Sequence, residues 1–220
     1  MAFWIATFAA LAVAYLFGSI PTAYLLGNLF YGLDIREHGS RSVGATNALR
    51  VLGRWPALVV LLIDIFKGVA AVVFAHWFSL SLFALPLAAA SPLDERTWTA
   101  WMVALAGLAA LLGHSRSIWL GFSGGKSVAT GLGVVLAISW PVAVGALAVF
   151  GVVTAWFRFV SLGSILAAAA ATLLVCTFEE PPPYRMLVVA GGLYVIARHR
   201  ANIRRLLAGA EPRVSLSPGR

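Results

Sequence analysis

The stretch from residue 55 to residue 78 reads WPALVVLLIDIFKGVAAVVFAHWF, and it decides the fold class. One helix of about 20 mostly apolar residues is long enough to cross the hydrocarbon core of a bilayer. This stretch has that length, and Asp64 and Lys67 are its only formally charged residues. It therefore predicts a membrane-spanning helix.

The composition of the whole chain agrees with this prediction. Of the 220 residues, 61% are hydrophobic and 11% are charged. Soluble proteins average about 25% charged residues, so this chain has too few to cover a water-exposed surface. This composition excludes a soluble enzyme and a disordered protein. A disulfide scaffold is also excluded, because the one cysteine, Cys176, can form no bridge within the chain.

Five further apolar stretches predict the remaining helices. They cover residues 3–30, 98–112, 128–157, 162–178 and 186–197. Gly18 and Pro21 predict a kink in the first of them. Ser139 and Pro141 interrupt residues 128–157 and predict two short helices joined by a turn. We therefore expect an all-α integral membrane protein with seven transmembrane helices, or five if residues 128–157 form a re-entrant element.

The charges between the apolar stretches predict the orientation of the chain, because basic residues collect on the cytoplasmic side of a membrane. The basic connections and tail contain Arg36, Arg41, Arg50, Arg54, Arg116, Lys126, Arg158, Arg198, Arg200, Arg204, Arg205, Arg213 and Arg220. The connections around residues 94–96 and 179–185 are net acidic. We expect the N-terminus outside and the C-terminus inside. Residues 1–220 then form one polytopic domain with cytoplasmic loops 31–54 and 114–127 and a basic cytoplasmic tail 198–220.

Three expected cytoplasmic segments contain most of the polar side chains. Residues 34–50 read DIREHGSRSVGATNALR, and their Gly, Ser, Thr and Asn residues suit a phosphate or carboxylate. Residues 121–130 read GFSGGKSVAT and place a lysine just before a helix, where an anion is favoured. This is no nucleotide P-loop, because Leu120 stands where that motif needs glycine. The alternatives are a positive-inside turn and a helix cap, respectively.

The third segment, residues 198–205, reads RHRANIRR. On a helix, His199 and Asn202 would share a face and could hold a phosphoryl group. The alternative is a basic cluster that binds anionic lipid. Asp64 and Lys67 also stand three residues apart, so they form either a structural pair or a substrate contact. No metal-binding motif is present, which favours a reaction of an already activated substrate.

Together these segments resemble the PlsY family, the bacterial acyl-phosphate:glycerol-3-phosphate acyltransferases. The matching pieces are GSIP (18–21), HGS (38–40), GATN (44–47), LR (49–50), Asp64 with KG (67–68), GH (113–114), GGK (124–126), VAT (128–130), SLGS (161–164) and RHR (198–200) with Asn202. They occur in order over nearly the whole chain.

The resemblance implies a compact bundle of seven short helices in the bacterial inner membrane, with the active site at the cytoplasmic face. The implied reaction moves a fatty acyl group from acyl phosphate to sn-glycerol 3-phosphate and yields lysophosphatidic acid and phosphate. It needs no metal or other cofactor. The expected partners are these substrates and membrane lipids, with a soluble enzyme that forms the acyl phosphate, and not nucleic acid. A small transporter or scramblase for an anionic lipid or phosphate ester is the alternative.

The resemblance also implies roles for individual residues. The implied catalytic residues are Ser40, Arg50, Lys126, His199 and Asn202, and the implied substrate-binding residues are Gly44, Thr46, Asn47, Lys67, Gly124 and Gly125. In this hypothesis the two cations neutralise phosphate charge, the other catalytic residues orient the reactants, and the departing phosphate accepts the proton. The chain differs from the usual family residues at Arg41, Ser42, Ser123, Ser127 and Ala201. The glutamate usual at the last of these positions is expected to help pack the tail.

Overall fold

The computed structural model describes residues 1–214, and its regular structure is helical. The helices are α1 (Ala2–Ser19), α2 (Thr22–Tyr31), α3 (Ala45–Val51), α4 (Arg54–Phe83), α5 (Glu95–Ser115), α6 (Val128–Ile138), α7 (Trp140–Phe157), α8 (Val160–Leu174), α9 (Pro182–Arg198) and α10 (Arg200–Leu207). The 3-10 helices η1 (Ile35–Glu37), η2 (Pro86–Ala90) and η3 (Ile118–Leu120) lie in the connections. The last part of the expected tail, which includes Arg220, lies outside the described residues.

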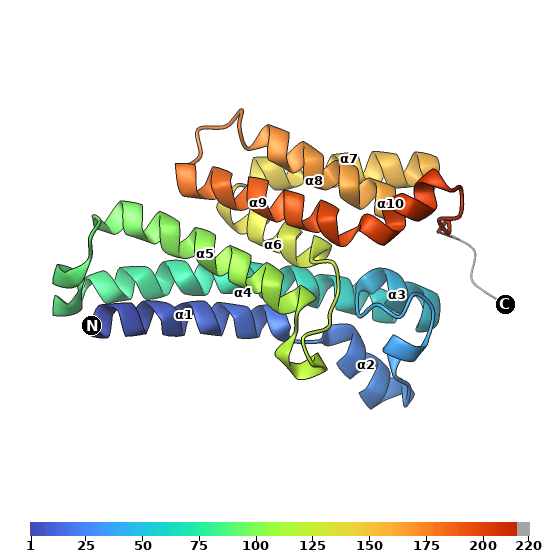
Figure 1. Cartoon of the computed structure of the whole chain (residues 1–220), viewed down its shortest axis with the longest axis horizontal. Coiled ribbons are helices and arrows are strands. Elements are labelled where there is room, and N and C mark those ends of the chain that lie inside the picture. The colour runs from blue at the N-terminus through green and yellow to red at the C-terminus, as the bar shows by residue number, and fades with distance from the viewer. Residues whose placement is uncertain (215–220) are drawn as a thin grey trace.

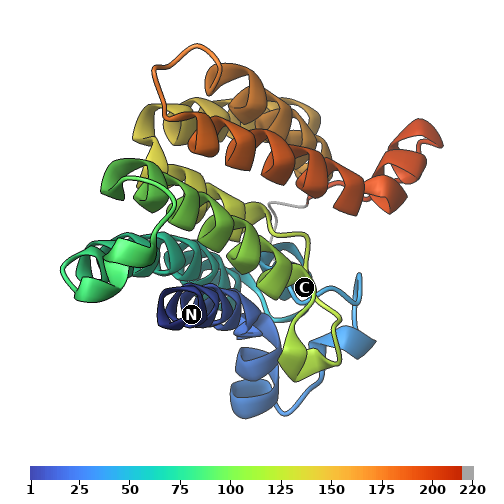
Figure 2. The same cartoon turned by 60° about the vertical axis from the view of Figure 1, so that its left-hand side comes forward.

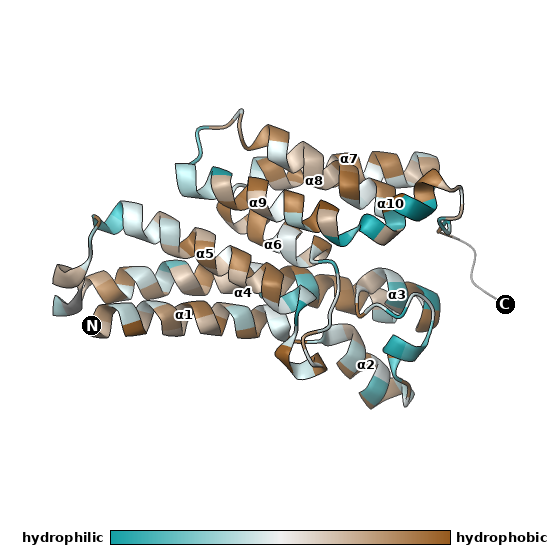
Figure 3. Ribbon diagram, viewed as in Figure 1, coloured by the Kyte–Doolittle hydropathy of each residue, from teal (hydrophilic) through white to brown (hydrophobic). Residues whose placement is uncertain are grey.

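The long helices form two groups joined by α6. Helices α1, α4 and α5 pack against one another, and α7, α8 and α9 form the second group (Figures 1 and 2). Helix α6 contacts α4 on one side and α7 on the other, and α5 also contacts α9. Hydrophilic residues gather at the end of the bundle that contains α3 and α10 (Figure 3).

Four helices, α1, α4, α5 and α7, are long and apolar enough to cross a membrane, and α6 and α8 are shorter apolar helices. The all-helical architecture predicted from the sequence is therefore confirmed, and these helices have the length and composition that a membrane protein needs. The predicted interruption of residues 128–157 is also confirmed, since Ser139 separates α6 from α7.

The first apolar stretch, residues 3–30, differs from the prediction, because it breaks into two helices instead of kinking. Helix α1 ends at Ser19, and Ile20 takes an extended conformation with ψ 114°. Residues before a proline are pushed out of the helical region by the proline ring. Pro21 also lacks the N–H that would continue the hydrogen bonds of α1. A separate helix, α2, therefore begins at Thr22.

Paired glycines allow two pairs of helices to approach at backbone distance. A Cβ atom at Gly18 of α1 or at Gly113 of α5 would overlap the backbone of the other helix. The same holds for Gly68 of α4 and Gly133 of α6. The adjacent core is rich in alanine, with Ala10, Ala14, Ala71, Ala75, Ala106 and Ala110 all buried. Small residues at helix contacts favour tight packing in membranes, where the hydrophobic effect does not drive helices together.

A buried ion pair fastens α4 to the break between α1 and α2. Lys67 Nζ lies 2.7 Å from Asp64 Oδ1, and the two side chains are 3% and 2% exposed. Lys67 also donates to the carbonyl of Ile20 at 3.0 Å, and Thr22 Oγ1 donates to Asp64 at 3.0 Å. The carbonyl and hydroxyl partners flank the proline break, so this network supports the structural alternative for the pair.

Candidate active site

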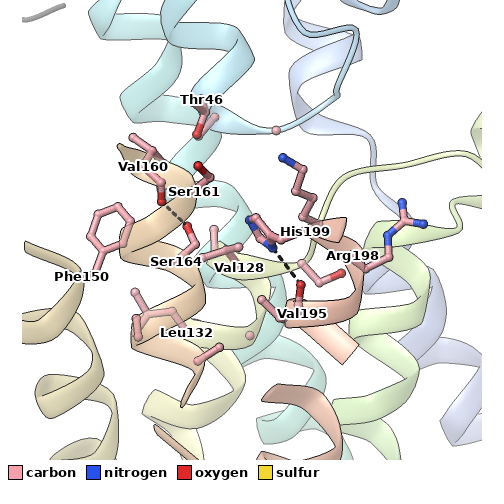
Figure 4. Close-up of a pocket in the computed structure, with 18 of the residues that line it drawn as sticks. Thr46, Val128, Leu132, Phe150, Val160, Ser161, Ser164, Val195, Arg198 and His199 are labelled. Atoms are coloured by element: carbon pink, nitrogen blue, oxygen red, sulfur yellow. Dashed lines mark hydrogen bonds between the residues drawn. The ribbon is translucent and has the colours of Figure 1, made fainter. Parts of the chain in front are cut away.

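A cavity of about 900 Å³ lies between the two groups of helices. Its polar lining includes Ser40, Arg50, Lys126, Ser161, His199, Asn202 and Glu211, and its apolar lining includes Leu61, Ile65, Leu132, Leu147, Phe150 and Val188. Figure 4 shows Thr46, Ser161 and His199 gathered toward one end of the cavity, with Leu132 and Phe150 beyond them. The cavity thus combines a polar head with an apolar stem.

All five of the implied catalytic residues line this one cavity, as do Gly44, Thr46 and Asn47. They come from the loop before α3, from α3 itself, from the loop before α6 and from the junction of α9 and α10. Segments up to about 160 residues apart in the chain therefore share one site, as expected for a folded bundle of this topology. Lys67, Gly124 and Gly125 are not part of the lining.

Asn47 organises the loop that presents Ser40. Its Nδ2 donates to the carbonyls of Ile35, His38 and Ser42, and its Oδ1 accepts a bond from the backbone N–H of Ser40 at 2.8 Å. With these four bonds the hydrogen-bonding capacity of a buried amide is well occupied. Asn47, an implied substrate-binding residue, thus lines the cavity and also holds this loop together.

Lys126 and Arg50 bring positive charge to the polar head. Within residues 1–214, neither has a carboxylate at ion-pair distance. Burial lowers the pKa of Lys126 to about 8, while the negative charge of Glu211 opposes this shift and the neighbouring Arg205 and Arg50 add to it. A partly dehydrated cation without an acidic partner is well suited to receive an anionic ligand.

The loop that contains Lys126 is held by its neighbours. The N–H of Gly125 donates to the carbonyl of His114 at 3.1 Å, and Arg198 Nη2 donates to the carbonyl of Gly125 at 3.1 Å. A Cβ at Gly125 would overlap the His114 ring. This glycine thus allows close packing on α5, and its N–H is already used.

His199 lies at the junction of α9 and α10 with its ring directed into the cavity (Figure 4). Its Nδ1 lies 2.8 Å from the carbonyl of Val195, which can only accept a hydrogen bond. The proton is therefore on Nδ1, and Nε2 has the lone pair. Burial, together with the charge of Lys126, lowers the pKa of His199 to about 4. His199 is thus neutral at pH 7 and presents a hydrogen-bond acceptor.

Glu211 is the site residue that sequence reasoning missed. It comes from the tail after α10, lines the cavity, and accepts hydrogen bonds from Ser161, Asn202 and Arg205. The only signal available in the sequence was an acidic residue in a basic tail. His114, Arg198 and Arg205 also line the cavity. Within residues 1–214, no cluster of three or more His, Cys, Asp or Glu side chains could hold a metal ion.

Comparisons with known proteins show the family of this chain. The family model for glycerol-3-phosphate acyltransferase matches residues 8–209. Glycerol-3-phosphate acyltransferase 2 of Rhizobium johnstonii is 63% identical over 97% of this chain and 98% of its own length. The Trichodesmium erythraeum enzyme is 51% identical over 93% and 90% of the two chains.

A solved structure shares the fold. The crystal structure of PlsY (YgiH), an integral membrane glycerol 3-phosphate acyltransferase, in its glycerol 3-phosphate form has a TM-score of 0.80 and 34% identity over 95% of this chain and 96% of the other. These similarities do not favour the transporter or scramblase alternative. They confirm the resemblance found in the motifs, and the chain belongs to the glycerol-3-phosphate acyltransferase family of integral membrane enzymes.

Proposed function

We propose that the cavity binds an acyl phosphate and sn-glycerol 3-phosphate together and transfers the acyl group between them. The observation that carries this proposal is the division of one cavity into a polar head, with Arg50 and Lys126, and an apolar stem. Both substrates are phosphorylated, and one has a fatty chain, so this division matches their chemistry. The related crystal structures are a glycerol 3-phosphate form and a lysophosphatidic acid form of PlsY, which agrees with the acceptor and the product.

In the proposed reaction, a hydroxyl oxygen of glycerol 3-phosphate attacks the acyl carbonyl carbon. A new C–O ester bond forms, and the C–O bond to the phosphoryl group breaks. Phosphate departs with the electron pair and takes up the hydroxyl proton. Acyl phosphate is a mixed anhydride with a good leaving group, so the protein mainly has to position the reactants and stabilise negative charge.

The residues of the polar head divide this work. Arg50 and Lys126 neutralise phosphate charge, and Ser40 and Thr46 donate hydroxyl hydrogen bonds to phosphoryl oxygens. His199 accepts the hydrogen bond of the attacking hydroxyl through Nε2, since its Nδ1–H is donated to Val195. Gly44 lets the loop before α3 approach the ligand closely. No cofactor takes part in this scheme.

We further propose that seven helices cross the membrane: α1, α4, α5, α6, α7, α8 and α9. The N-terminus and the α4–α5 connection lie at one end of the bundle, and α3 and α10 lie at the other (Figure 1). The second end has the basic loops and tail, which supports a cytoplasmic position in the bacterial inner membrane. In this arrangement a soluble enzyme that forms acyl phosphate delivers it on the cytoplasmic side. The acyl chain enters the stem from the bilayer.

The test uses purified protein in detergent with palmitoyl phosphate and glycerol 3-phosphate. We expect release of phosphate and formation of lysophosphatidic acid in equal amounts. Palmitoyl-CoA serves as the comparison donor. Arg96→Ala, at the opposite end of the bundle, is the control for the loss of a cation in Lys126→Met. If the donor gives no lysophosphatidic acid, or if palmitoyl-CoA works as well, the proposed donor is wrong.

A further inference from the structure

The carboxyl-terminal segment after α10 turns back onto the active site. Val214 N–H donates to the carbonyl of Arg158 at 2.8 Å, and the guanidinium of Arg213 lies 5.3 Å from the centre of the Phe159 ring. Glu211 and Pro212, which lie between these contacts and α10 in the chain, line the cavity. The segment is therefore part of the site, although it follows the last helix of the bundle.

The Glu211 carboxylate connects two elements at this wall. Its Oε1 accepts hydrogen bonds from Ser161 of α8 at 2.6 Å and from Asn202 of α10 at 2.7 Å. Its Oε2 pairs with Arg205 Nε at 2.7 Å, and the Glu211 side chain is 3% exposed.

We propose that Glu211 is a positioning residue that holds the side-chain amide of Asn202 in the one orientation that serves acyl transfer. A carboxylate can only accept hydrogen bonds, so Asn202 must turn its NH2 group toward Glu211. The Oδ1 atom of Asn202 then faces away and accepts a hydrogen bond from the second hydroxyl of glycerol 3-phosphate, the one that does not attack. This inference rests on the proposed function and on the catalytic role that the family resemblance implies for Asn202.

Glu211 itself is poorly suited to take a proton from the substrate. Burial raises its pKa, but the hydrogen bonds from Ser161, Asn202 and Arg205 outweigh this effect and hold the pKa below its usual value. An ionised carboxylate with three donors already bound is a weak base. Its effect on the reaction therefore has to pass through the groups that it holds.

A double-mutant cycle between Glu211→Gln and Asn202→Ala tests the proposal. Glutamine offers both a donor and an acceptor, so in the single variant the Asn202 amide can turn over. We expect E211Q to lower kcat at least tenfold, with KM for glycerol 3-phosphate changed less than about threefold. In the N202A background the same substitution should cost no more than about twofold, because interacting residues are not additive.

Arg213→Ala is the matched control for docking of the tail. It removes the contact with Phe159 but leaves the Glu211–Asn202 hydrogen bond in place, so kcat should stay within about twofold of the starting protein. All variants are first compared by gel filtration and thermal unfolding in detergent. If E211Q is not recovered as a monodisperse protein, Glu211→Asp, which shortens the side chain by one methylene, replaces it in the cycle with the same criteria.

The outcomes separate this inference from the proposed function. An equal loss from E211Q in both backgrounds, or full activity of E211Q beside an impaired N202A variant, overturns the positioning role alone. Full activity of N202A overturns the assigned role of Asn202 and the positioning role with it. An inactive starting protein overturns the proposed function.

Discussion

The two lysines of the chain lie in different settings, Lys67 buried and Lys126 half-buried, and the difference between them separates architecture from activity. Lys67 has an aspartate at 2.7 Å and a backbone carbonyl at 3.0 Å, both provided by the protein. Lys126 lines the cavity, and within residues 1–214 no carboxylate lies at ion-pair distance from it. One positive charge is satisfied by the fold, and the other is available to an anion from outside.

The physical reason for this difference is the cost of dehydrating a charge. A buried ion loses its hydration, and a nearby opposite charge has to compensate for that loss. In the Asp64–Lys67 pair the compensation is permanent, so the pair stabilises the junction of α1, α2 and α4. In the proposed function, the compensation at Lys126 comes from a bound phosphate, so this cation lowers the stability of the unliganded protein and favours binding.

Removing Lys67, the lysine paired with Asp64, should have the largest effect, and this effect should be a loss of stability. Lys67→Met leaves Asp64 as an uncompensated buried charge, which typically costs about 3–5 kcal/mol. We expect the free energy of unfolding to fall by about this amount, measured by chemical unfolding in detergent. A variant as stable as the starting protein would contradict the structural role of the pair.

Removing Lys126, the lysine without a carboxylate partner among residues 1–214, should lower turnover and leave the fold intact. Lys126→Met takes away a cation that neutralises phosphate, and loss of one such group typically costs about 10²–10³-fold in kcat, or roughly 3–4 kcal/mol. The assay is lysophosphatidic acid formation from palmitoyl phosphate. Because burial without a partner is unfavourable, the variant should be at least as stable as the starting protein. Near-normal turnover would refute the role of Lys126.

The glycine contact between α4 and α6 should give a smaller effect, and it tests the close packing of these two helices. A Cβ at Gly133 would overlap the backbone of α4, so Gly133→Ala should destabilise the protein by about 1–3 kcal/mol through overpacking. A Cβ added at Gly151 of α7 would instead meet open space within the described part of the chain. Gly151→Ala is therefore the control, and it should be neutral or stabilising by up to about 1 kcal/mol. Equal melting temperatures for the two variants would argue against the close approach.

The pH dependence should be the smallest effect. Lys126 is charged below its pKa of about 8 and loses its charge as the pH rises through that value. For a single titrating group, kcat/KM should therefore fall about fivefold between pH 8 and pH 9. His199, with a pKa of about 4, stays neutral throughout this range. In Lys126→Arg the charge persists, so whatever activity remains should show no such alkaline decline; an unchanged decline would assign it to another group.

Several elements of the fold follow from local patterns and are predicted correctly. The apolar runs mark the helices, and Ser139 with Pro141 marks the break between α6 and α7. The break after α1 is predicted only as a kink, because Gly18 and Pro21 are compatible with both. The extended conformation of Ile20 is stabilised by the hydrogen bond that Lys67 Nζ donates to the Ile20 carbonyl. Lys67 is 47 residues away in the chain.

The candidate site is predictable where its residues belong to compact motifs. Ser40, Arg50, Lys126 and His199 line one cavity, as the motifs lead us to expect. The motifs do not distinguish residues that face the cavity from residues that support it. Asn47 lines the cavity but also ties a loop together, and Gly125 stands next to Lys126 in the chain but packs on His114.

By itself, the sequence determined that this protein belongs in a membrane, where its helices lie and to which family it belongs. The length of an apolar stretch and the presence of a short motif are local properties of the chain. Only the tertiary structure decided which charges are paired, which nitrogen of His199 has the lone pair, and that Glu211 joins the site. Each of these depends on the groups that surround a side chain after folding. Ser161 and Glu211 are 50 residues apart in the chain, and packing alone brings them to 2.6 Å.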